Sequence, residues 1–252
     1  MIKIHRPGTD LTPVEPKLHL FAGGETHAVV DPHLVRHQKI WVEAHVSSMV
    51  DMGYLMCTLD AIIRSRPLSL GLYIPYFPGA RQDHPEPGTP GTMQIYVDML
   101  RRFDLDVTVV ADPHSAVLPA MMPCEIISAG DILGNTKTFE YNGIIAPDAG
   151  AEKRAAEVAK EFGGLPVFTA HKIREQATGR ITSFKMDKLE MGHYLLVDDI
   201  CDGGATFNIL AESVRRGYNA GGPVLDLYVT HGIFSKGYSQ RLSNFEKIYT
   251  TN

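Results

Sequence analysis

The sequence contains few cysteines, only three among 252 residues. Cys57, Cys124 and Cys201 are odd in number and widely separated, and none forms a CxxC pair. This pattern argues against a disulfide framework and against a structural zinc site. It is typical of a protein kept in a reducing compartment, so we expect a cytoplasmic location.

The sequence also lacks an excess of positive charge, and it has no long apolar runs. The chain has 24 Lys and Arg against 29 Asp and Glu, a formal net charge of −5, which gives no electrostatic footprint for nucleic acid or an anionic membrane. No apolar run approaches the roughly 20 residues of a membrane span. The first ten residues, "MIKIHRPGTD", carry no apolar core of a signal peptide. We therefore expect neither a nucleic-acid nor a membrane partner.

Several apolar segments end in an acidic residue and lead into a helical pattern. They include "VTVVADPHS" (107–115), "GIIAPDAGAEKR" (143–154) and "YLLVDDICDGG" (194–204). Runs of Val, Ile and Leu without strict alternation are typical of strands buried on both faces, hence of parallel sheets in an α/β fold. Strand ends with acids in both parts of the chain predict two similar domains, at 1–137 and 138–252.

Helical spacing of apolar residues predicts three helices. One follows Gly150 and stops at the glycine pair 163–164, and a second runs from Phe207 to a stop at Gly217. A third helix is expected from His33 to Met49. The segment "HPEPGTPGT" (84–92) is rich in proline and glycine and predicts a loop.

The most informative stretch is "YLLVDDICDGGATF", in which two acids close a buried strand and a glycine-rich turn comes next. Open α/β sheets bind ligands at the carboxyl ends of their strands. Residues 202–206 can wrap a phosphate with backbone N–H groups at the start of the next helix. Asp198 and Asp199, one sugar's length away, can accept hydrogen bonds from paired ribose hydroxyls. The stretch therefore predicts a sugar-phosphate site, formed by Asp198, Asp199, Asp202, Gly203, Gly204, Ala205 and Thr206.

Two other interpretations of this stretch stay open at the sequence level. The acids could hold Mg²⁺, for which carboxylate oxygens are suitable ligands. The whole segment could instead be a solvated acidic turn, with Asp202 as the N-cap of the following helix.

The stretch resembles the phosphoribosyl pyrophosphate loop of type I phosphoribosyltransferases. Further segments resemble one branch, the ribose-phosphate diphosphokinases, and occur in that family's order. These segments are "FAGGET" (21–26), "PYFPGARQDH" (75–84), "ADPHS" (111–115), "APDAGAEKRA" (146–155), "HKIR" (171–174) and "THGIFS" (230–235). The resemblance implies two phosphoribosyltransferase-type domains, each a mainly parallel sheet flanked by helices. It also implies transfer of the β,γ-diphosphate of ATP to the anomeric hydroxyl of ribose 5-phosphate, with Mg²⁺ as cofactor.

The resemblance implies a role for individual residues. Lys172 and Arg174 match the family's catalytic pair, on a loop that closes over the phosphates. His114 and Asp148 match its metal ligands. By themselves, a K-x-R pair is commonplace and a lone His after a strand is more often structural.

Nucleotide-binding residues are implied in the N-terminal half. Arg81, Gln82 and Asp83 match the nucleotide-binding segment, to which His114 also contributes. Phe21 and Glu25 match contacts to adenine, a ring for stacking and a hydrogen-bond acceptor. In the family these last contacts come from a neighbouring subunit, so the resemblance implies a homo-oligomer.

The sequence departs from the family at the sugar-phosphate loop. The family usually has D-T-x-G-T, whereas this chain has Gly203 in place of the first Thr and Ala205 in place of a Gly. The roomier loop suggests an alternative acceptor, a 5′-substituted ribose such as ADP-ribose. A base-salvage phosphoribosyltransferase has no use for the segments at 81–84 and 171–174. A non-catalytic regulatory relative is expected to lose Lys172 or Arg174, which this chain keeps.

Overall fold

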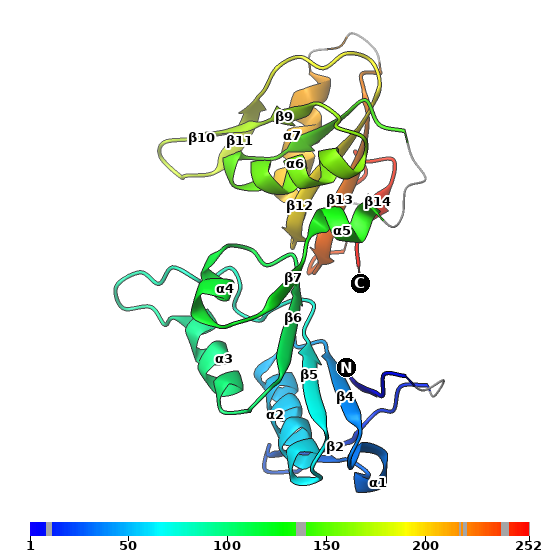
Figure 1. Cartoon of the computed structure of the whole chain (residues 1–252). Helices are drawn as coiled ribbons and strands as arrows, with labels where there is room; N and C mark the ends of the chain where they lie inside the picture. The colour runs from blue at the N-terminus through cyan, green and yellow to red at the C-terminus, as the bar shows by residue number, and fades with distance from the viewer. Residues whose placement is uncertain (9–11, 135–139, 217, 219–220, 238–241, 252) are drawn as a thin grey trace. The chain divides into compact units, whose positions relative to one another are not determined.

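The computed structural model describes residues 1–8, 12–134, 140–216, 218, 221–237 and 242–251. The chain divides into two compact units, Met1–Ile127 and Ser128–Asn252 (Figure 1). The domain boundary predicted between residues 137 and 138 lies outside the described residues and stays a prediction. Each unit is described by itself below.

The first unit is built on a five-stranded sheet of order β1-β4-β5-β6-β7. Strand β1 pairs antiparallel with β4, and the remaining pairs are parallel. The strands are β1 (Ile2–His5), β4 (Lys39–Ala44), β5 (Ser69–Tyr73), β6 (Val107–Ala111) and β7 (Glu125–Ile127). The helices are α1 (Pro32–Val35), α2 (Met49–Arg64), α3 (Thr92–Arg101) and α4 (Val117–Met121). A separate hairpin joins β2 (Lys17–Leu20) to β3 (Thr26–Val29).

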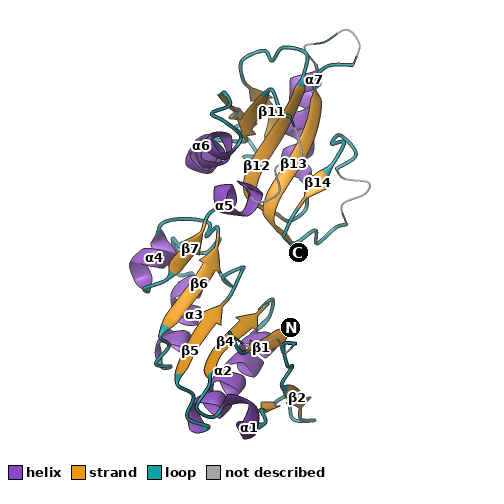
Figure 2. Cartoon of the chain, turned by 45° about the vertical axis from the view of Figure 1, so that its right-hand side comes forward, coloured by secondary structure: helices purple, strands orange, loops and turns teal. Residues whose placement is uncertain are grey.

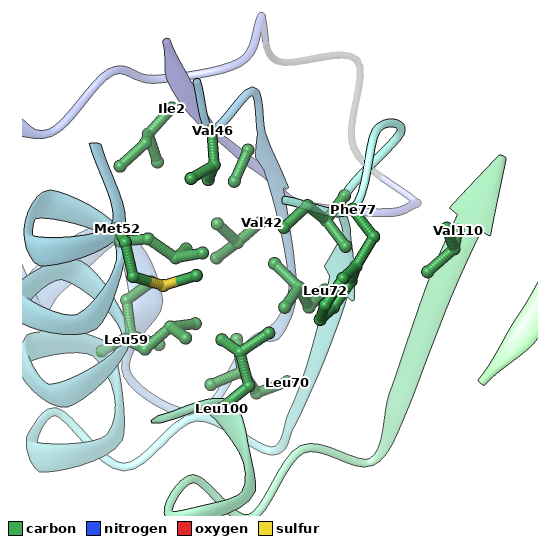
Figure 3. Packing of buried hydrophobic residues seen from close by; sticks show 14 of the residues in the cluster. Ile2, Val42, Val46, Met52, Leu59, Leu70, Leu72, Phe77, Leu100 and Val110 are labelled. Atoms are coloured by element: carbon green, nitrogen blue, oxygen red, sulfur yellow. The ribbon is translucent and has the colours of Figure 1, made fainter. Parts of the chain in front are cut away.

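The core of this unit lies between the sheet and helices α2 and α3. Met52 and Leu59 of α2 face Val42 and Leu72 of the central strands (Figure 3). All four side chains are 0–1% exposed. Burial of this kind contributes on the order of 2 kcal/mol for each large apolar side chain.

The helix expected from His33 to Met49 is wrong. This stretch holds the short α1 (Pro32–Val35) and the strand β4 (Lys39–Ala44), and α2 begins only at Met49. Alternate residues of β4 are buried, a period of two that requires a strand. The Ser48 hydroxyl accepts a hydrogen bond from the amide of Asp51 at 3.1 Å and caps α2, which fixes where the helix begins.

The second unit contains an all-parallel five-stranded sheet of order β14-β13-β12-β8-β9. Figure 2 shows its strands β12, β13 and β14 side by side. Its strands are β8 (Gly143–Ala146), β9 (Val167–Thr169), β12 (His193–Cys201), β13 (Val224–Gly232) and β14 (Ile248–Tyr249). The helices are α5 (Ala129–Gly134), the 3-10 helix η1 (Ala149–Ala151), α6 (Glu152–Glu161) and α7 (Ala205–Arg215). An antiparallel hairpin joins β10 (His171–Arg174) to β11 (Ile181–Lys185).

Both faces of this sheet are covered, which explains the unbroken apolar run of β12. Leu195 and Val197 pack in the cluster that contains α6, whereas Leu196 packs in the cluster that contains α7. The expected α/β fold with parallel strands is confirmed, and so are the helices expected after Gly150 and before residue 217. In the part of the chain that is described, no helix is long and apolar enough to cross a membrane.

Candidate functional site

The carboxyl end of β12 brings Asp198 and Asp199 together with a buried arginine. Asp199 is 4% exposed, and its amide donates to Oδ1 of Asp198 at 2.9 Å. Nη1 of Arg154, in the first turn of α6, lies 3.6 Å from Oδ1 of Asp198 and 3.9 Å from Oδ1 of Asp199. One guanidinium thus faces both carboxylates.

The electrostatics of this pair depend on burial. Burial, followed by the adjacent charge of Asp199, raises the pKa of Asp198 well above its ordinary value, while the positive charge of Arg154 opposes the rise. The Arg154 side chain is only 10% exposed. Sequence reasoning missed this residue. The available signal is its spacing, because Arg154 lies one helical turn before the buried Val158.

The turn after β12 forms an open helix start. Gly204 is the N-cap of α7 with φ +74°, a left-handed conformation that favours glycine, and no side chain caps this end. Asp202 is not the N-cap. Its Oδ1 accepts a hydrogen bond from the Ser235 hydroxyl, in the loop after β13. Backbone N–H groups at such an end are oriented to bind an anion.

Gly203, where the sequence departs from the resembling family, has free space around it. Its φ is not among the positive values, and a Cβ built there would meet only Cδ of Lys236, at 3.8 Å. Neither backbone conformation nor packing therefore requires glycine at this position. Lys236 was not among the predicted site residues.

The predicted catalytic pair lies on β10 of the hairpin. Lys172 Nζ forms an ion pair with Oδ2 of Asp148, the predicted metal ligand. Nη1 of Arg174 donates to the carbonyl of Gly179 at 3.0 Å, within the turn of the same hairpin. The structure therefore brings Lys172 and Asp148 together and holds Arg174 against its own hairpin.

Asp148 also shapes the backbone at the end of β8. Its Oδ1 accepts a hydrogen bond from the amide of Ala151 at 3.1 Å and caps η1. Burial opposes ionisation of this carboxyl, but the Lys172 ammonium and the backbone amides outweigh it and hold its pKa below the ordinary value. A carboxylate that stays ionised is available to a cation.

In the first unit, one contact joins two of the predicted nucleotide-binding segments. The Ser115 hydroxyl donates to Oδ2 of Asp83 at 2.5 Å, and Nδ1 of His84 lies 3.1 Å from the other carboxylate oxygen. Burial opposes ionisation of Asp83, yet these two hydrogen bonds outweigh it and lower its pKa. Arg81, Gln82 and His114 flank this contact, and all three are exposed.

The predicted adenine contacts lie at the tip of the β2–β3 hairpin. Phe21 is 55% exposed, and its amide donates to the carbonyl of Glu25 at 2.9 Å, which closes the turn. The ring of Phe21 lies 6.1 Å from that of His27. Both predicted residues face solvent, as a contact to a separate molecule requires.

The predicted metal ligands come from different units, His114 from the first and Asp148 from the second. The described residues contain no group of three or more His, Cys, Asp or Glu suited to a metal ion. Mg²⁺ needs no such group, since it is commonly held by one or two carboxylates together with waters and substrate phosphates. The ionised carboxylate of Asp148 fits that mode of binding.

The chain is similar to several known proteins over most of its length. No family model matches the chain. Ribose-phosphate pyrophosphokinase of Aquifex aeolicus is 28% identical over 244 residues, which cover 92% of this chain and 76% of the relative. The enzyme of the same name from Rhizobium meliloti is 27% identical over 197 residues, 75% of this chain and 62% of the relative. The crystal structure of phosphoribosylpyrophosphate synthetase from Mycobacterium smegmatis matches with a TM-score of 0.80 and 22% identity. This match covers 96% of this chain and 82% of that one, and it supports the fold.

Proposed function

We propose that the chain, which is similar to ribose-phosphate pyrophosphokinases over most of its length, transfers the β,γ-diphosphate of ATP to the anomeric hydroxyl of ribose 5-phosphate. The products are phosphoribosyl pyrophosphate and AMP. The names of the relatives favour ribose 5-phosphate over the 5′-substituted ribose considered from the sequence.

The end of β12 carries the proposal. Asp198 and Asp199 accept hydrogen bonds from the ribose hydroxyls, and the N–H groups at the start of α7 bind the 5′-phosphate, together with the Thr206 hydroxyl. Arg154 faces both carboxylates, at 3.6 and 3.9 Å, and its positive charge opposes the rise in the pKa of Asp198. The sugar is thereby held with its anomeric carbon directed away from the helix start.

The reaction needs positioning and cations more than covalent chemistry. The anomeric oxygen attacks the β-phosphorus and loses its proton, and the bond from that phosphorus to the α-phosphate oxygen breaks to release AMP. Lys172 and Arg174 neutralise negative charge on the transferred group. Lys172 must leave Asp148 to do so, and their partial exposure makes that exchange inexpensive.

Nucleotide binding is assigned to the first unit. Arg81 suits a bidentate contact with phosphate, Gln82 suits an edge of adenine or ribose, and Asp83, fixed by Ser115, orders their segment. Asp148 and His114 remain the predicted ligands of Mg²⁺, which would screen the phosphate charges when bound.

Assembly and location complete the proposal. The exposed Phe21 and Glu25 at the hairpin tip complete the adenine site of a neighbouring subunit, so the active form is a homo-oligomer. A Phe21→Ala variant should then raise KM for ATP. Cys57, Cys124 and Cys201 are all free thiols, which supports a reducing, cytoplasmic location.

One incubation tests the reaction. The protein is mixed with ATP, Mg²⁺ and ribose 5-phosphate, and the products are followed by phosphorus NMR. AMP and a new diphosphate ester should appear in equal amounts, and neither should form without the acceptor. Release of ADP, or no acceptor-dependent AMP, would contradict the proposal.

A further inference from the structure

The loop after β13 delivers a lysine to the sugar-phosphate turn. This loop runs through Gly232, Ile233, Phe234, Ser235 and Lys236. The amides of Ile233 and Phe234 both donate to the carbonyl of Cys201, at 2.9 and 3.1 Å. The Ser235 hydroxyl then donates to Asp202. Three successive residues of this loop are therefore tied to the turn after β12.

The path of the loop depends on two unusual backbone features. Phe234 has φ +46°, a left-handed conformation that is a genuine outlier for a bulky residue. Its ring folds back over Gly232, where a Cβ would come within 2.1 Å of Phe234 Cε2, so a side chain at this position would force the ring to move. This reversal turns the chain so that Ser235 and Lys236 reach the neighbouring loop. Strained backbone of this kind often marks a functional position.

Lys236 extends beside the position that departs from the resembling family. Its Cδ lies 3.8 Å from the Cβ position of Gly203, and its ammonium is two bonds further along. The turn already carries the acids Asp198, Asp199 and Asp202, which repel a phosphate dianion. Arg154 faces the first two of them rather than the phosphate side. A cation near Gly203 offsets that repulsion where the 5′-phosphate binds.

We propose that Lys236 determines acceptor specificity by binding the 5′-phosphate of the sugar, in place of the hydroxyl that Gly203 cannot supply. The inference rests on the proposed function, since it concerns the acceptor of that reaction. Lysine is suited to this task because its ammonium donates three hydrogen bonds as a point charge.

Lys236→Met tests the charge while it keeps most of the stem. We expect KM for ribose 5-phosphate to rise roughly tenfold or more, as for loss of a hydrogen bond to a charged group. The kcat and KM for ATP should change little. The KM of the wild-type protein should also rise with added salt, and that of the variant should rise less. The matched control is Lys160→Met, which removes a lysine from the last turn of α6. Its kinetic constants should equal those of the wild-type protein.

A second substitution, Gly203→Thr, tests whether Lys236 binds the 5′-phosphate or only supports the structure of the loop. In the Lys236→Met background, the added hydroxyl should recover part of the affinity for ribose 5-phosphate. The chain should accept it, since the position is open. An unchanged KM in Lys236→Met, or a fall in kcat alone without any rescue, would overturn the assignment to Lys236. If the wild-type protein forms no AMP with ribose 5-phosphate, the proposed function itself fails, whatever the variants do.

Discussion

Acidic residues lie at the carboxyl ends of β6 and β12, and the two strand ends differ in the segments that come after them. In the first unit, β6 leads into Asp112 and then Ser115, whose hydroxyl is engaged by Asp83 of the same chain. The helix after it, α4, has five residues. In the second unit, β12 leads into a left-handed glycine and the eleven-residue α7, whose start has no side-chain cap. At the first strand end a side-chain hydrogen bond orders a neighbouring segment, and at the second the helix start has no side-chain cap.

Removal of the cationic pair, Lys172 and Arg174, should give the largest loss of activity. It should leave the start of α7 unchanged. In Lys172→Ala with Arg174→Ala, we expect turnover to fall by about 10² to 10³ or more, because positive charge near the transferred phosphate is lost. The melting temperature should barely change, since the Lys172–Asp148 pair is partly exposed and contributes about 0–1 kcal/mol. Steady-state kinetics and thermal melting measure both. Lys185→Ala on the same hairpin is the control, and retained turnover in the double variant would refute the role.

The second-largest effect, a loss of stability, is expected in Arg154→Met. This variant leaves the carboxylates of Asp198 and Asp199 at the end of β12 without their cation. Loss of the partner of a buried charge costs roughly 3 kcal/mol at neutral pH. The pKa of Asp198, already raised by burial and by Asp199, should rise further. A raised folded-state pKa favours folding below the unfolded value of 3.8 and loses that benefit as pH rises through the folded pKa. The deficit of the variant should therefore shrink toward pH 3, and a constant deficit would contradict this account.

The parts of this site that are contiguous in the chain could be predicted from the sequence. The acids at 198 and 199, the glycine turn and the helix after it lie in one continuous segment, so strand burial and turn chemistry were enough to place them. The same holds for β6 and the loop after it. Local sequence also misled, since a helix was expected from His33 to Met49, whereas Ile40, Val42 and Ala44 are buried in alternation and form a strand.

The contacts made by residues distant in sequence could not be predicted. Lys172 lies 24 residues from Asp148, and Lys236 approaches Gly203 only because Phe234 reverses the chain. Such pairings depend on the order of strands in the sheet, here β13 beside β12, which periodicity does not fix. Arg154 was missed for the same reason, since its partners lie on another element.

Gly203 and Gly204, in the turn between β12 and α7, test the conformation of that turn. Gly204→Ala places an L-residue at φ +74° and should destabilise the second unit by about 1–2 kcal/mol. Gly203→Ala should change the free energy of unfolding by less than about 0.5 kcal/mol, since its Cβ meets only Lys236 at an ordinary distance. Hydrogen exchange of the α7 amides measures both. Equal effects would mean that the turn is not held in the described conformation.

An effect smaller than that of Gly204→Ala is expected at the end of β6, in Ser115→Ala. Burial raises the pKa of Asp83, but the hydrogen bonds from Ser115 and His84 outweigh it, so the folded-state pKa lies below 3.8. A depressed pKa stabilises the fold above the unfolded value and ceases to do so as pH falls through the folded value. The variant should therefore lose about 1 kcal/mol at pH 7 and nothing once Asp83 is protonated.

Fluorescence of Trp41, the single tryptophan, reports unfolding of the first unit, since it lies in β4. The control is Ser115→Ala in an Asp83→Asn background. Because Asn does not titrate, the deficit there should be the same at both ends of the pH range. If the loss of stability still depended on pH in that background, the effect would belong to another acid. The ends of β6 and β12 would then differ only in the helices that follow them, α4 and α7.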